Sequence, residues 1–128
     1  MKKTLKWMGI AFLLLTVIMV LFAMVGLKET VNLTIGEVSL TEIADGDYTG
    51  EYVNGRFSNT VLVSVRDHTI TAIQPIKISD GQASLSETLT QRVLEAQQPD
   101  VDLIAGATAS SKSFLKAVEI ALTDTKAQ

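Results

Sequence analysis

A long apolar run near the N-terminus dominates the hydrophobic pattern. No residue between Trp7 and Leu27 is charged, and Thr16 is the single hydroxyl residue in the run. At about 1.5 Å per residue, a helix of this length extends about 31 Å, close to the ~30 Å hydrocarbon core of a bilayer. The pattern predicts a transmembrane helix. It divides the chain into a stub and single anchor at 1–27, a juxtamembrane segment at 28–44 and a folded domain at 45–128.

Alternation of apolar and polar residues predicts β-structure after the anchor. Val31, Leu33 and Ile35 alternate with polar residues, which is typical of a short strand or an extended linker. Further runs predict three strands in an antiparallel meander, with a tight connection before the last of them: Tyr48–Val53, Thr60–Val65 and Thr69–Gln74.

Two positions in this predicted sheet carry further information. Gly50 lies inside the first strand, where a glycine indicates a bulge or a close approach by backbone or ligand. Strict alternation in the third strand places three groups on the inner face: Ile70, Ala72 and the pair Pro75–Ile76.

Helical spacing replaces alternation in the last third of the chain, after a turn signal at Ser79–Gly81. One set of apolar residues predicts a helix over 84–97, with Ser84 or Ser86 as its cap: Leu85, Leu89, Val93 and Leu94. A second set predicts a helix over 111–123: Phe114, Leu115, Val118, Ala121 and Leu122. The expected fold is α+β, with an N-terminal transmembrane helix followed by a small antiparallel sheet packed with two helices.

Charge predicts the orientation of the anchor. Three lysines precede the apolar run (Lys2, Lys3 and Lys6), whereas Lys28 and Glu29 follow it and cancel. The positive-inside rule therefore places the N-terminus in the cytoplasm and the domain outside. A cleaved signal peptide is the alternative. The run is longer than the 7–15 apolar residues of such peptides and lacks a clean cleavage site, so an uncleaved anchor is favoured.

Composition excludes several classes of function. All 14 acidic residues follow the anchor, and an acidic exterior domain repels nucleic acid. The chain has no cysteine and one histidine, which leaves no catalytic Ser/His/Asp or Cys/His set and no cysteine-based metal site. We therefore expect no catalytic residue set of these kinds and no metal site.

A run of small residues before the last predicted helix is the strongest candidate for chemistry. Ala105–Ser111 contains one glycine and three hydroxyl side chains, and small side chains let a ligand approach the backbone. Free N–H groups at a helix start bind phosphate. The alternative is structural: Ser110 or Ser111 caps the helix, and the small residues simply pack closely.

The segment Asp102–Thr108 resembles the flavinylation motif of the FMN-binding domain family, Asp-x-x-(Ser/Thr)-Gly-Ala-Thr. This domain occurs in subunits of the sodium-translocating NADH:quinone reductase, in the related Rnf complex and in small exported flavoproteins. The opening strand at Asp45–Tyr52, the hairpin at Thr60–Ile73 and the two helices follow the family order. The resemblance covers about residues 45–123.

The resemblance implies FMN as the cofactor, with its phosphate esterified to Thr108 by a separate FAD-dependent flavin transferase. It makes Asp102 the leading acid of the motif and places Gly106 and Ala107 beside the attachment point. The family usually has Ser or Thr where this chain has Ala105. Ala109 adjoins the site, and Ser110 and Ser111 are alternative acceptors.

The implied function is that of a membrane-anchored extracytoplasmic electron relay, rather than an autonomous enzyme. Its partners would be the flavin transferase, membrane lipid and a membrane dehydrogenase or quinone-linked redox partner, with no role for nucleic acid. The alternative is a flavin-free, membrane-anchored interaction or regulatory module of a larger membrane complex, which the alanine at position 105 favours. A third hypothesis is non-covalent binding of FMN or another phosphate ligand in the same pocket.

Overall fold

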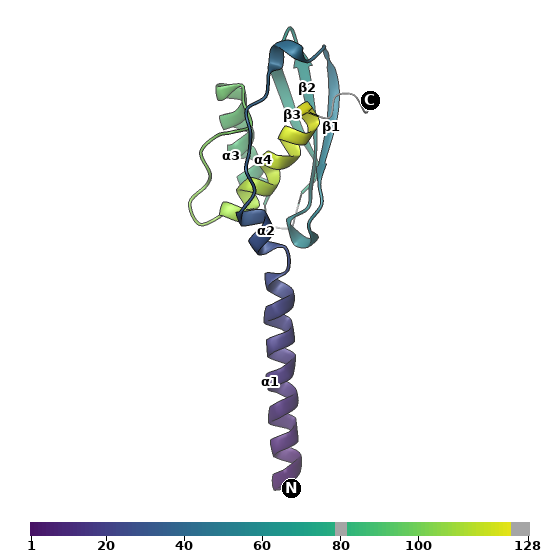
Figure 1. Cartoon of the computed structure of the whole chain (residues 1–128), viewed down its shortest axis with the longest axis vertical. Coiled ribbons are helices and arrows are strands. Elements are labelled where there is room, and N and C mark those ends of the chain that lie inside the picture. The colour runs from purple at the N-terminus through teal and green to yellow at the C-terminus, as the bar shows by residue number, and fades with distance from the viewer. Residues whose placement is uncertain (79–81, 124–128) are drawn as a thin grey trace.

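The computed structural model describes residues 1–78 and 82–123, so the predicted turn at 79–81 lies outside the described residues. The expected α+β fold is confirmed. In chain order the helices and strands are α1 (Lys2–Met24), α2 (Leu27–Val31), β1 (Gly46–Tyr52), β2 (Asn59–Arg66), β3 (Thr69–Lys77), α3 (Ala83–Ala96) and α4 (Thr108–Thr123). Figure 1 shows a compact α+β unit at one end of a long projecting helix.

The projecting helix is α1, and none of its residues is buried. By length and composition, the helical stretch Lys2–Val31 is able to cross a membrane. A signal sequence meets the same criterion, so the finding supports a candidate single-pass anchor, while the uncleaved state and the orientation stay predictions.

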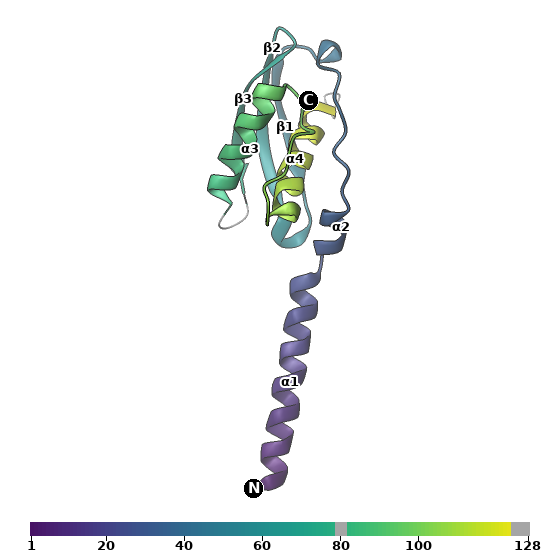
Figure 2. The same ribbon diagram turned by 90° about the vertical axis from the view of Figure 1, so that its left-hand side faces the viewer.

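The sheet is one-sided, which explains its alternating strands. Its order is β1-β2-β3, with both pairs antiparallel. Helix α4 packs on β1 and β2, and α3 contacts β3 and α4 (Figure 2). Valines at alternate positions of β2 (Val61, Val63 and Val65) are fully buried beneath the helices. The intervening residues of β2 are only partly buried, as expected for a sheet with one covered face.

Gly50 is the point of closest approach between the sheet and α4. A Cβ atom built at this position would lie 2.5 Å from the Ala121 nitrogen, 2.8 Å from Ala121 Cβ and closer still to the Ala117 carbonyl oxygen. The pairing of β1 with β2 runs through Gly50 without a register shift. The expected close approach by backbone is therefore confirmed, and the backbone is that of α4.

Two register shifts correct the predicted inner face of β3. Ala72 and Ile76 were expected to face inward, and both are exposed. The partner of β3 changes register between Ser64 and Val65 and again between Thr60 and Val61. Each shift inserts one extra residue in β3, which reverses the side-chain alternation beyond it. Ile73 is buried as a result.

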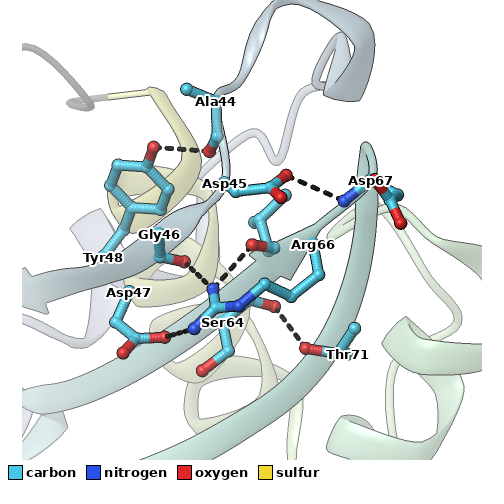
Figure 3. A network of polar contacts seen from close by, with 10 residues as sticks. Ala44, Asp45, Gly46, Asp47, Tyr48, Ser64, Arg66, Asp67 and Thr71 are labelled. Atoms are coloured by element: carbon cyan, nitrogen blue, oxygen red, sulfur yellow. Dashed lines mark hydrogen bonds and ion pairs between the residues drawn. The ribbon is translucent and has the colours of Figure 1, made fainter.

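The turn between β2 and β3 is the tight connection that the sequence predicts. Asp67 and His68 both have positive φ, 50° and 59°, which is the signature of a type I′ hairpin turn. Arg66 links β2 to β1 at this end of the sheet. Its guanidinium donates to the Gly46 carbonyl at 2.9 Å and forms an ion pair with the Asp47 carboxylate at 3.2 Å (Figure 3). The pKa of Asp47 is lowered by its hydrogen bond with Ser64 and then by Arg66.

The two long helices of the domain differ from their predictions at their N-terminal ends. α3 begins after Gln82 with no side-chain cap, so the expected capping by Ser84 or Ser86 is wrong. Ser86 is instead buried and donates to the Ala83 carbonyl at 2.8 Å. α4 begins at Thr108, three residues earlier than predicted, because the small residues from 108 to 110 continue the helix.

The juxtamembrane segment is partly helical and is bound to the domain along its length. Val31 ends the short helix α2, so a strand starting there is wrong. Residues 33–39 are neither helix nor strand and run along the domain as a linker (Figure 2). Side chains of the domain hold this segment through the backbone of four of its residues: Lys112 to Val31 O at 2.5 Å, Lys116 to Thr34 O at 3.3 Å, Gly36 N to Glu119 at 3.3 Å and Val38 N to Gln98 at 2.7 Å.

Candidate functional site

A β-turn positions the start of α4. The Ala107 N–H donates to the Ile104 carbonyl at 3.0 Å, and Gly106 at the third turn position has φ +79°. A type II turn requires positive φ at that position, which favours glycine. A Cβ at Gly106 would meet no atom of the described residues within 4 Å, and its φ of +79° is the reason for glycine here.

Thr108 is the first residue of α4, and its side chain is exposed. The first intrahelical bond runs from the Ser111 N–H to the Ala107 carbonyl at 2.8 Å. Ala107 therefore occupies the N-cap position, where it has no side-chain oxygen to accept from the first turn. The N–H groups of Thr108, Ala109 and Ser110 have no intrahelical acceptor, as at any helix start. Ser110 and Ser111 lie inside the first turn, so neither is the N-cap.

An open hollow of about 370 Å³ lies beside Thr108. Five consecutive residues line it: Gly106, Ala107, Thr108, Ala109 and Ser110. It is also lined by Leu27 and Val31 of α2 and by Arg56 and Phe57, which follow β1. Figures 1 and 2 both show α2 beside the first turn of α4, at the end of the domain that continues into α1.

Arg56 brings positive charge to this hollow. Its guanidinium lies 4.8 Å from the centre of the Phe57 ring, and the Phe57 side chain is buried. No carboxylate among the residues 1–78 and 82–123 forms an ion pair with Arg56. An anion in the hollow would therefore meet a guanidinium and the positive end of the α4 dipole.

A second, larger hollow of about 660 Å³ shares Arg56, Phe57 and Ser110 with the first. Lys77 and Gln82 also line it. Gln82 Nε2 donates to Ser110 Oγ at 2.9 Å, whereas its buried Oε1 has no hydrogen-bond partner within the described part of the chain. A buried acceptor without a partner costs free energy unless a ligand or water supplies the donor.

The remaining predicted site residues lie apart from the Thr108 hollow. Asp102 lines a different hollow with Arg92, whose guanidinium donates to the Asp102 carbonyl at 2.8 Å. Ala105 is exposed at the second position of the β-turn, where alanine is compatible with the backbone. Ser111 is fully buried and accepts from the Ile104 N–H at 3.2 Å, which ties the turn to α4.

Comparison with known protein families identifies the family of this chain. The model of the FMN-binding domain matches residues 57–123, which is just over half of the chain. The chain belongs to the FMN-binding domain family. FMN is therefore its cofactor, and the resemblance noted in the sequence is confirmed over residues 57–123. No curated protein matches the chain.

The residues around Thr108 fit the chemistry of FMN. A phosphate monoester needs hydrogen-bond donors and positive charge, and the first turn of α4 and Arg56 offer both. The isoalloxazine ring has one N–H donor among several acceptors, and the buried Gln82 Oε1 is an acceptor that lacks a donor. The hollows are within the ~300–1,000 Å³ range of small-molecule sites.

The sequence alone does not reveal the other residues that line the hollow with the motif. Leu27, Val31 and Arg56 are distant from Thr108 along the chain, and none belongs to a recognisable motif. Val31 is an apolar residue that follows the predicted anchor. It was a weak signal of a binding site, because it fitted an alternating strand equally well.

Proposed function

We propose that this chain is a membrane-anchored, extracytoplasmic flavoprotein that carries FMN esterified to Thr108 and relays electrons at the membrane surface. The observation that carries the proposal is the exposed Thr108 side chain, which lies in a hollow between the uncapped first turn of α4 and Arg56. Ser111, by contrast, is fully buried, and Ser110 is already engaged by Gln82.

The attachment step requires FAD and a flavin transferase. Thr108 Oγ attacks the flavin-side phosphorus of FAD and forms an Oγ–P bond. The pyrophosphate P–O bond breaks, AMP leaves with the bonding electrons, and the hydroxyl proton passes to a base of the transferase. The product is a phosphodiester with one negative charge, which the α4 N-terminus and Arg56 can stabilise. The backbone hydrogen bonds that the described residues form in the turn do not involve Ala105, so the turn does not need a hydroxyl at this position.

The relay role rests on the cofactor and on the position of the site. When bound, FMN supplies one-electron and two-electron redox chemistry. The three N-terminal lysines favour a cytoplasmic N-terminus, which puts the domain outside. α2 and the first turn of α4, which line the site, lie at the end of the domain next to α1 (Figure 1), and this suits exchange with a membrane dehydrogenase or a quinone-linked partner. A covalent tether prevents loss of the cofactor outside the cell.

The ester is tested by producing the full chain together with a flavin transferase. Denatured wild-type protein should fluoresce as a single band on a gel, and its intact mass should include FMN. Thr108→Val should abolish both signals because the nucleophile is absent. Thr71→Val is the matched control, since Thr71 is an exposed threonine at the opposite end of the sheet, and it should label like wild type.

Two outcomes would overturn covalent attachment at Thr108. A Thr108→Val protein that stays fluorescent after denaturation places the bond on another residue, and Ser110→Ala then tests the nearest hydroxyl. Wild-type protein that is yellow when native but releases its flavin on denaturation binds FMN without a covalent bond.

A further inference from the structure

The juxtamembrane helix α2 forms one wall of the hollow that contains Thr108. Leu27 is half-buried there and Val31 is 37% exposed, which makes Val31 one of the few large apolar side chains exposed outside α1. The family match begins at residue 57, so α2 lies outside the matched residues. A role for α2 in the site is therefore a property of this chain's own structure.

A polar cluster holds α2 against the domain. Thr30 is fully buried, and its hydroxyl donates to the Gly26 carbonyl at 2.7 Å and lies 3.0 Å from the Tyr52 hydroxyl. Asn54 Nδ2 donates to Thr30 Oγ1 at 3.0 Å and to the Gly26 carbonyl at 3.1 Å. These bonds join α2 to the segment that leads to Arg56, so both sides of the hollow are held by one cluster.

Two further features show that α2 is positioned rather than loosely tethered. Gly26 has φ +80°, and a Cβ there would lie 2.9 Å from Asn54 Cγ, so the elbow between α1 and α2 depends on glycine. At the other end of α2, Lys112 of α4 donates to the Val31 carbonyl, the last of the helix. Val31 is thus held in place from the same helix that carries Thr108.

The two hollows adjoin each other, because Arg56, Phe57 and Ser110 line both. The larger one contains Lys77, Gln82 and two serines beside Ile78, and these polar groups suit the pyrimidine end of a flavin ring. The smaller one contains, besides the residues around Thr108, the aliphatic side chains of Leu27 and Val31, which suit the dimethylbenzene end. Removing that end from water against two aliphatic side chains is favourable.

We infer that Leu27 and Val31 of α2 are flavin-positioning residues, packing against the dimethylbenzene part of the FMN ring. The inference rests on the proposed attachment at Thr108, which places the phosphate in the same hollow. The juxtamembrane helix is then part of the cofactor site, and the flavin lies between the anchor and the domain.

Tryptophan substitution tests the position of the ring in the full-length protein, because an indole in contact with a flavin quenches its fluorescence. Val31→Trp should remove most of the native flavin fluorescence. Val53→Trp is the matched control, since Val53 is exposed and lines neither hollow, and it should leave the fluorescence unchanged. The native Trp7 lies twenty residues before Leu27, about 30 Å along a helix, which is too far to quench.

Denaturation separates this inference from the proposed ester. In denaturant, Val31→Trp and Val53→Trp should fluoresce equally, which shows equal loading with FMN. If Thr108→Val abolishes labelling while native Val31→Trp is as bright as Val53→Trp, the ester stands and the α2 wall is wrong. Quenching by Ile78→Trp without quenching by Val31→Trp places the ring in the other hollow and also overturns the inference. If Val31→Trp is quenched but the flavin is released on denaturation, the contact between α2 and the ring stands and only the ester is overturned.

Discussion

Gly50→Ala is the substitution for which the structure makes the sharpest prediction. The added methyl group would collide with α4 backbone at Ala117 and Ala121, and a helix backbone cannot rotate aside as a side chain can. Real Cβ atoms essentially never approach other atoms closer than 3.0 Å, so α4 must move away from β1 by about 1 Å. That movement loosens the packing of the buried residues between them.

The expected loss in the free energy of unfolding can be estimated from the effect of overpacking on protein cores. Overpacking usually destabilises by about 1–3 kcal/mol, and a clash with backbone belongs at the upper end of that range. Replacing a strand glycine returns about 0.5–1 kcal/mol of conformational entropy. A net loss of about 2 kcal/mol is large against the ~5–15 kcal/mol stability of a typical domain, and it lowers the melting temperature by about 8–16 °C.

The assay is a thermal melt of the full chain in detergent, followed by near-ultraviolet circular dichroism of Tyr48 and Tyr52, which both lie in β1. Far-ultraviolet signals are less useful because α1 stays helical in detergent. Gly36→Ala is the control, since a Cβ there meets only Glu119 Oε1 at 3.7 Å. Equal melting temperatures for the two variants would refute the close approach of α4 to β1.

Two further predictions concern the elbow and the far end of the sheet. Asn54→Ala should release α2 and speed hydrogen exchange of the Thr30 amide about 5–30-fold, which corresponds to about 1–2 kcal/mol. Asn32 is exposed, so Asn32→Ala should leave this exchange rate unchanged. An unaltered exchange rate in Asn54→Ala would contradict the role of the polar cluster in holding α2. The lowered pKa of Asp47 means that its ionised form stabilises the folded domain, fully above its ordinary value of 3.8 and progressively less as the pH falls through the lower folded value. The difference in melting temperature between wild type and Asp47→Asn should therefore close below pH 3.8, and a constant difference down to acidic pH would show that ionisation of Asp47 is not its cause.

Several features of this protein follow from its sequence because they depend on neighbours along the chain. The candidate anchor is a matter of length and the absence of charge. The strands and helices follow from the periodicity of apolar residues. The turn at Asp67–His68 follows from the short gap between two strand patterns. The turn around Gly106 can also be recognised from the sequence, because the type II turn and the helix start involve adjacent residues.

Features that join distant residues depend on the folded structure. The bulges that turn Ala72 and Ile76 outward arise where β3 pairs with β2, and no alternation in β3 alone records them. α2 is too short to be stable by itself, so its helical form depends on docking against α4.

The candidate site shows the same division most clearly. The order of residues is enough to show that Thr108 follows a glycine in a segment that resembles the FMN-binding domain motif. Folding is needed to bring Leu27, Val31 and Arg56 to the same hollow. Their positions depend on chain closure and on hydrogen bonds through Thr30, Asn54 and Lys112, which are contacts between segments that the sequence pattern treats separately.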